Sequence, residues 1–220
     1  DIPDLARLKV KNGGQIKNFD ANNHFEQKKI ARMDRFSQFA LLAADEAITS
    51  SGLKNSQETW SENAGIILGS SIGGIETINN SYKQVFEEGH NRLHPLTIPK
   101  IMNNSATSLI SIEYRIQGPS FTVSSACSSA NHAMGLAYET IKSRKSNIMI
   151  TGGSESFLSF GGIVYLYNIH NIYKIMYKKK KSVILFPKKK CNFLKKKDVY
   201  KISNEINPKA VSYTHLRAHE

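Results

Sequence analysis

Cys127 is the side chain in this sequence best placed to act as a nucleophile. It lies within Thr122–Ala130, where a short apolar segment leads directly into small residues and then into helical spacing. A cysteine at the start of a helix faces unpaired backbone N–H groups and the positive end of the helix dipole, which favour the thiolate form. The same N–H groups can stabilise the oxyanion that forms when a thiolate attacks a thioester carbonyl. The segment therefore predicts a strand-to-helix elbow that presents a nucleophile.

The local pattern also fits a purely structural cysteine. An isolated cysteine in an apolar strand–helix unit is commonly a small buried hydrophobic residue. A nucleophilic cysteine also needs a base or an electrophilic partner. His132 follows Cys127 by five residues on the same helix and so points to a different face, whereas His24, His90 and His94 fall in predicted loops. Local chemistry leaves both interpretations of Cys127 open.

Alternating strands and helices must position this segment. Apolar runs between turn-forming residues predict strands over Ala64–Gly69, Phe121–Ser124 and Asn147–Thr151. Apolar residues at three- and four-residue intervals predict the helices, which cover 32–48, 75–88, 101–114 and 128–143. Strands separated by helices of this length predict an α/β fold with a parallel sheet covered by helices.

Helix-capping and turn-forming residues indicate where the predicted helices begin and end. Asp34 is a predicted N-cap, and Gly52 is expected to stop the helix that follows it. Pro95 and Pro99 predict a loop before the helix over 101–114.

The net charge of +12 is concentrated near the end of the chain. Residues 1–162 contain 16 basic and 15 acidic residues, whereas residues 163–220 contain 14 basic and 3 acidic ones. All 14 glycines lie at or before Gly162. From 163 to 210, 32 of the 48 residues are Lys, Ile, Asn, Tyr or Phe, which have A/T-rich codons. The chain therefore has two compositions that need separate interpretations.

Composition also excludes several classes of protein. With 40% hydrophobic and 9% aromatic residues, the chain can form a core, which excludes global disorder. No apolar run approaches roughly 18 residues and no secretory leader is visible. The two cysteines, Cys127 and Cys191, form no disulfide framework, so we expect a reducing compartment.

Five blocks between about Gly14 and Gly162 resemble the N-terminal half of the elongating 3-oxoacyl-[acyl-carrier-protein] synthases, the β-ketoacyl condensing enzymes of type II. They occur in the same order and with similar spacing. The blocks are Ala31–Phe36, Gly69–Gly74, Asn103–Ser120, Val123–Gly135 and Met149–Glu155.

This resemblance implies a thiolase-like fold, of which residues 1–162 would be the N-terminal half of a five-layered αβαβα architecture with a mixed five-stranded sheet in each half. It implies an acyltransferase of fatty acid biosynthesis that performs a decarboxylative condensation of an acyl-cysteine enzyme with malonyl-[acyl-carrier-protein]. Cys127 matches the nucleophile, and its backbone amide matches one of two oxyanion donors. Ile72 matches a position that lines the acyl pocket and limits its depth. No metal and no redox cofactor are implied.

The resemblance also implies partners. These are acyl carrier protein, loaded with acyl or malonyl groups, and a second copy in a homodimer, with no nucleic acid and no membrane. The stretch from Asn103 to Tyr114 matches part of the family's dimer contact. We expect a cytoplasmic protein, or one of a plastid or mitochondrion if the source is eukaryotic.

Four glycines in the matching blocks are expected to form turns at strand ends rather than to contact substrate. They are Gly73, Gly74, Gly152 and Gly153.

We expect three segments along the chain. Residues 1–162 correspond to the N-terminal half of a synthase without its first strand. Residues 163–210 are interpreted as read-through or a frameshift, and residues 211–220 resemble a translated sequencing adapter. The two histidines and the lysine that the family takes from its C-terminal half have no matching blocks here, so we expect this chain alone to be inactive.

Two alternatives remain at this stage. One is a polyketide-type ketosynthase or another acyltransferase of the thiolase superfamily. The other is a module whose lysine-rich tail binds nucleic acid or an anionic membrane, with tyrosines between the lysines for base stacking. A lysine run is usually a solvated segment, which disfavours the second alternative.

Overall fold

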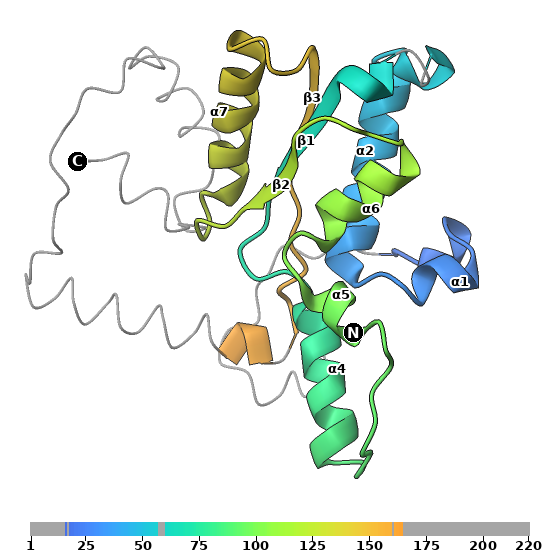
Figure 1. The fold of residues 1–220 in the computed structure, drawn as a ribbon. Coiled ribbons are helices and arrows are strands. Elements are labelled where there is room, and N and C mark those ends of the chain that lie inside the picture. The colour runs from blue at the N-terminus through green and yellow to red at the C-terminus, as the bar shows by residue number, and fades with distance from the viewer. Residues whose placement is uncertain (1–15, 17, 57–59, 160, 165–220) are drawn as a thin grey trace, which may run out of the picture. The chain divides into compact units, whose positions relative to one another are not determined.

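Three parallel strands form the sheet in the computed structural model, which describes residues 16, 18–56, 60–159 and 161–164 (Figure 1). The strands are β1 (Ala64–Gly69), β2 (Ser120–Val123) and β3 (Ile148–Gly153), in the order β2-β1-β3. The central strand β1 is buried along its whole length, because it has a strand on each side and helices on each face. The predicted α/β fold with a parallel sheet is thus confirmed.

The four predicted helices are present with different bounds, as α2 (Arg35–Ser50), α4 (Ile75–Phe86), α6 (Ser105–Glu113) and α7 (Ser129–Lys142). The structure adds the short helices α1 (Gln27–Ile30) and α5 (Thr97–Ile101) and the 3-10 turns η2 (Ala21–Asn23), η3 (Leu53–Ser56) and η4 (Ser61–Asn63). Asp34 caps α2 as predicted, because its carboxylate accepts a hydrogen bond from the N–H of Phe36. The helix begins at Arg35 rather than at residue 32, and Gly52, with φ of 76°, follows its end.

The helix predicted over 101–114 is present as α6, but it begins at Ser105 rather than at residue 101. The separate helix α5 precedes it, because the backbone of Met102 is extended between the two, with ψ of 137°. The loop predicted at Pro99 is wrong, since this proline is the third residue of α5. Proline is tolerated in the first turn of a helix, where its missing N–H breaks no helical hydrogen bond.

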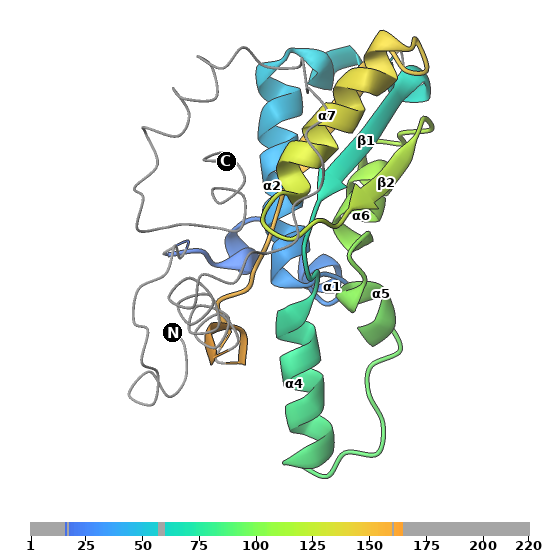
Figure 2. The same cartoon turned by 90° about the vertical axis from the view of Figure 1, so that its left-hand side faces the viewer.

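Helices cover both faces of the sheet (Figure 1). Successive residues of a strand point to opposite faces, so Ile66 and Ile67 belong to different cores. Ile66 packs with Phe36 of α2 and Ile110 of α6, and Ile67 packs with α7. All four of these apolar side chains are fully buried or nearly so, because sheet and helices leave no room for water. In the turned view of Figure 2, α4 extends away from the end of β1.

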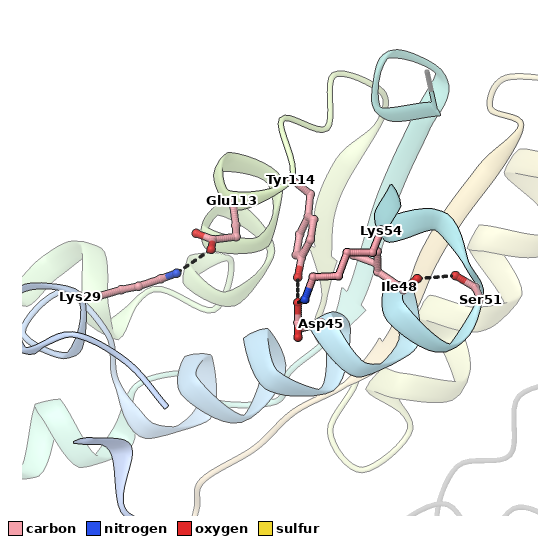
Figure 3. A network of polar contacts seen from close by, with 7 residues as sticks. All are labelled: Lys29, Asp45, Ile48, Ser51, Lys54, Glu113 and Tyr114. Atoms are coloured by element: carbon pink, nitrogen blue, oxygen red, sulfur yellow. Dashed lines mark hydrogen bonds and ion pairs between the residues drawn. The ribbon is translucent and has the colours of Figure 1, made fainter. Parts of the chain in front are cut away.

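A polar network joins α2 to the end of α6 (Figure 3). The hydroxyl of Tyr114 donates to Asp45 Oδ1 at 2.6 Å, and Lys54 Nζ donates to the same oxygen at 2.8 Å. The hydrogen bonds from Lys54 and Tyr114 lower the pKa of Asp45, and burial raises the pKa of Tyr114 above its usual value. Lys29 and Glu113 add an ion pair at 2.8 Å.

All described residues belong to one compact unit within Asp1–Tyr165. Residues 163 and 164 are the only described ones of the segment predicted over 163–210, and the segment 211–220 lies outside the described residues. The proposed division of the chain therefore stays a prediction. Within the described ranges, no helix has the length and apolar character needed to cross a membrane.

Candidate active site

The predicted site residues lie at one edge of the sheet. Since the three strands are parallel, their carboxyl ends meet at the same edge, which is where ligand sites occur in sheets of this kind. The segments that leave this edge are Ser70–Gly74 after β1, Ser124–Ser128 after β2 and Ser154–Glu155 after β3. Ile72 belongs to the first of them and Cys127 to the second.

Cys127 is exposed and lies on a tight elbow between β2 and α7. The residue before it, Ala126, has φ of 51°, a left-handed conformation that costs energy for any residue except glycine. The hydroxyl of Ser129 stabilises this conformation, because it accepts from the N–H of Ser125 at 2.9 Å and donates to the carbonyl of Ala126 at 2.6 Å. The predicted strand-to-helix elbow is present, and Cys127 is exposed on it among the described residues, while its role as a nucleophile stays a prediction.

Two glycines let the start of α7 lie directly on the sheet. A Cβ atom on Gly69 would lie 2.3 Å from the backbone nitrogen of Ala130, and a Cβ on Gly153 would lie 2.6 Å from the Ala130 side chain. Both distances are far inside van der Waals contact, so only glycine fits at either position. The ends of β1 and β3 thus set the height of the elbow above the sheet.

The glycine predictions need one correction. Gly73, with φ of 76°, and Gly74 do form the turn after β1. Gly152 and Gly153 instead pair with Leu68 and Gly69 as the last residues of β3, so they are not in a turn after it.

The turn after β1 is held by side chains from the segments after β2 and β3 and from the break between α5 and α6. Glu155 Oε2 accepts from the backbone N–H of Ser71 at 2.7 Å and from that of Ile72 at 3.3 Å. The carbonyl of Ser71 accepts from the hydroxyl of Ser124 at 3.1 Å and from Asn103 Nδ2 at 3.4 Å. Ile72 itself is 37% exposed. It lies at the same edge of the sheet as Cys127, and its role in an acyl pocket stays a prediction.

Sequence reasoning missed Glu155, Asn103 and Ser124 as members of this site. Glu155 and Ser124 each follow the end of a strand by one or two residues, and this position was the available signal. Asn103 had no such signal, because it acts from the break between α5 and α6.

The histidines do not supply a partner for Cys127 among the described residues. His132 Nδ1 lies 2.6 Å from the hydroxyl of Ser125, and no hydrogen bond joins it to the thiol. His24 stacks on Phe19, and His94 accepts from the N–H of Leu96. His90 approaches Glu88 at 3.9 Å. In the part of the chain that the structure describes, no three His, Cys, Asp or Glu side chains could together hold a metal ion.

Comparison with known proteins places this site in context. The family model described as "Beta-ketoacyl synthase, N-terminal domain" matches residues 2–181. The chain is 33% identical over 153 residues to 3-oxoacyl-[acyl-carrier-protein] synthase 2 of Staphylococcus aureus, covering 70% of this chain and 38% of that protein. The synthase 2 of Synechocystis is 31% identical over 147 residues, covering 67% of this chain and 35% of that protein. The chain thus spans less than two fifths of the length of these relatives.

Solved structures show the same fold. A β-ketoacyl synthase from Burkholderia phymatum superposes with a TM-score of 0.67 at 25% identity, covering 76% of this chain and 42% of that one. A ketosynthase of a type II polyketide synthase, solved in complex with its acyl-carrier protein, superposes with a TM-score of 0.63 at 23% identity, covering 69% of this chain and 43% of that one. The predicted thiolase-like fold is confirmed over the part that is compared.

Proposed function

The chain belongs to the β-ketoacyl synthase family, and we propose that it is the N-terminal part of an elongating 3-oxoacyl-[acyl-carrier-protein] synthase of fatty acid biosynthesis. The observation that supports this activity is the exposed Cys127 on its strained elbow, at the carboxyl edge of a parallel sheet. No separate observation favours a polyketide-type ketosynthase. The curated relatives are named 3-oxoacyl-[acyl-carrier-protein] synthase 2. The lysine-rich tail invoked for a nucleic-acid or membrane module lies outside the described residues.

In the first half-reaction, the Cys127 thiolate attacks the carbonyl carbon of an acyl thioester on acyl carrier protein. A new carbon–sulfur bond forms to Cys127, and the bond to the carrier's sulfur breaks. The carrier leaves as a thiolate and takes up a proton. The backbone N–H of Cys127 donates to the transient oxyanion, which is the charge that forms only in the transition state and intermediate.

In the second half-reaction, malonyl-[acyl-carrier-protein] loses carbon dioxide, and the electron pair left on its C2 atom attacks the acyl carbonyl on Cys127. The carbon–sulfur bond to Cys127 breaks, which regenerates the thiolate and releases 3-oxoacyl-[acyl-carrier-protein]. We propose that the groups assisting decarboxylation come from sequence beyond this N-terminal part, and that the 220-residue chain alone is inactive.

Ile72 would limit the depth of the acyl site. It lies on the turn after β1, whose Ser71 carbonyl is bonded to Ser124, three residues before the nucleophile. A branched side chain at this place would restrict how far an acyl chain extends from Cys127.

Acyl carrier protein is the proposed partner for substrate delivery, supported by the family and by the ketosynthase solved with its carrier. We also propose a homodimer. Among the described strands, β2 has an open edge, where Phe121 is 43% exposed, and Ile112 on the adjoining α6 is 75% exposed. An unpaired strand edge next to apolar side chains favours pairing with a second copy. A cytoplasmic or organellar location remains a proposal from the family alone.

Loss of the thiol tests this function. In the full-length protein that contains this chain, Cys127→Ala should abolish transfer of an acyl group from hexanoyl-[acyl-carrier-protein] to the protein, measured as the mass shift of the intact protein. Glu46→Gln, at an exposed position of α2, should leave transfer unchanged. Acylation that persists in Cys127→Ala would remove this residue from the mechanism. Acylation from hexanoyl-coenzyme A alone, and none from the carrier, would instead indicate a chain-initiating synthase or a thiolase.

A further inference from the structure

We propose that Glu155 is a positioning residue, which fixes the turn of Ser71 and Ile72 and thereby sets the acyl chain-length preference at Cys127. The proposal rests on the proposed function for its second half only. The first half, that one carboxylate holds the turn, concerns the structure of the protein and can be tested without activity.

One oxygen of Glu155 makes all of the contacts to the turn. Oε2 accepts from the N–H of Ser71 at 2.7 Å, from its hydroxyl at 2.5 Å and from the N–H of Ile72 at 3.3 Å. Hydrogen bonds to a carboxylate are about twice as strong as those between neutral groups. Two consecutive backbone N–H groups bound to the same charge leave the turn little freedom to rotate its peptide planes.

The opposite side of the turn is held more weakly. The carbonyl of Ser71 accepts from the hydroxyl of Ser124 and the amide of Asn103, at 3.1 and 3.4 Å. Both donors are neutral, and the second distance is beyond the usual range for such a bond. Among the described residues, Glu155 therefore supplies the one carboxylate that accepts hydrogen bonds from this turn.

Within the described structure, Glu155 makes side-chain hydrogen bonds only to this turn. Oε1 is buried and has no hydrogen-bond partner. Buried polar atoms are rarely left without a partner, and retaining one has a cost. Oε1 of this carboxylate therefore has no partner among the described residues, whereas Oε2 accepts every hydrogen bond, all of them from the turn that contains Ile72.

The connection also joins neighbouring strands. Glu155 follows β3 and the turn follows β1, and the two strands pair along their full length up to Gly69 and Gly153. The carboxylate thus holds the turn in a fixed position relative to the edge of the sheet. Without that connection, the hydrogen bonds from Ser124 and Asn103 would still hold the turn, but they would restrict the position of residue 72 relative to the Cys127 elbow less closely.

Three substitutions test the proposal in the full-length protein. Glu155→Ala removes the acceptor, and Glu155→Asp withdraws it by one methylene. Glu155→Gln keeps one acceptor oxygen but places an N–H₂ group where Oε1 has no partner. Glu46→Gln is the matched control, because that glutamate is exposed on α2 and makes no contact with the turn. Circular dichroism and thermal unfolding identify any variant that does not fold, in which case Glu155→Gln, the least disruptive change, decides the matter.

The first readout is amide hydrogen exchange at Ser71 and Ile72. Glu155→Ala should accelerate exchange at both amides by roughly tenfold or more, the scale expected for losing a hydrogen bond to a charged group. Glu155→Gln should show a smaller increase, and Glu46→Gln none. Unchanged exchange at these amides in Glu155→Ala would overturn the proposal.

The second readout is the ratio of kcat/KM for myristoyl- and hexanoyl-[acyl-carrier-protein]. We expect this ratio to change by about tenfold in Glu155→Ala, with partial recovery in Glu155→Gln. The alkylation rate of Cys127 by iodoacetamide should stay at its wild-type value. A ratio that stays constant while exchange accelerates would overturn the claim on specificity, as would an equal loss for both substrates. A wild-type protein with no condensing activity would instead contradict the proposed function.

Discussion

The two faces of the sheet are completed to different degrees. On the face covered by α2 and α6, large side chains are fully buried, including Phe36 and Ile110 at 0% exposure. On the other face, α7 buries the small side chains of Ala133 and Ala137, while larger apolar ones on its outer side remain exposed. The exposed ones are Met134 at 45%, Leu136 at 43%, Tyr138 at 50% and Ile141 at 45%.

This difference separates stability from chemistry. The α2–α6 face has a finished core, so the free energy of folding for this part should come mainly from there. The α7 face has the proposed nucleophile Cys127 just before the start of its helix, and it exposes several large apolar side chains. In the proposed five-layered architecture, the outer side of α7 would meet the second half of the protein.

The largest effect on stability is expected at Phe36. Phe36→Ala should lower the free energy of unfolding by about 3–5 kcal/mol, because it leaves a cavity in the finished core. The matched change Phe86→Ala, at a side chain that is 75% exposed on α4, should cost less than about 0.5 kcal/mol. Urea unfolding of both variants measures the difference, and similar losses would show that this face does not provide most of the stability.

A smaller effect is expected at Asp34. This carboxylate is 2% exposed and caps two helices, since Oδ1 accepts from Phe36 in α2 and Oδ2 accepts from the N–H and hydroxyl of Thr77 in α4. Asp34→Ala should cost about 2–3 kcal/mol through the lost cap and the unpaired groups of Thr77. Asp20→Ala, at the exposed cap of η2, is the control and should cost less than about 1 kcal/mol in the same unfolding assay.

The network of Asp45 should give a weak pH dependence. The hydrogen bonds from Lys54 and Tyr114 hold the pKa of Asp45 below its usual value. The stabilisation that ionised Asp45 gives to the folded state is therefore fully present above the unfolded pKa of about 3.9. It is lost as the pH falls through the lower, folded pKa. Because the Asp45 side chain is 45% exposed, the effect should stay below about 1 kcal/mol. Asp45→Asn should flatten stability between about pH 5 and pH 2, and an unchanged slope would contradict the assignment.

The smallest effect on the stability of this chain is expected at the exposed apolar residues of α7, and it tests most directly how the two faces of the sheet differ. Met134→Gln and Ile141→Gln should change the stability of this 220-residue chain by less than about 0.5 kcal/mol each, because both side chains are exposed. In the full-length protein, the same changes should cost about 1–3 kcal/mol if a second half covers them. Equal effects in the two proteins would show that this side of α7 is a free surface.

The sequence predicted the elements whose causes are local. Strand β1 follows from an apolar run between turn formers, and the start of α2 follows from Asp34. The elbow at Cys127 was predictable because an apolar strand, small residues and helical spacing follow one another directly. Each of these features depends on residues close together in the chain.

What depends on distant residues was not predicted. Helical spacing continues across Met102, but the amide of Asn103 is taken up by the carbonyls of Ser70 and Ser71, more than thirty residues earlier. The role of Glu155 likewise requires knowing that β1 and β3 are neighbours in the sheet. No local pattern contains that information, since it arises from strand order.

The fold depends on Gly69 having no side chain, although this residue has no group that could take part in the chemistry. A single methyl group there would press the end of β1 against the backbone of Ala130 and push the elbow outward. Inactivating mutations of this protein can therefore arise at a residue that touches no substrate, and they would leave every reactive atom in place. A screen that ranks positions by their chemistry would overlook Gly69, whereas one that ranks them by available space would find it first.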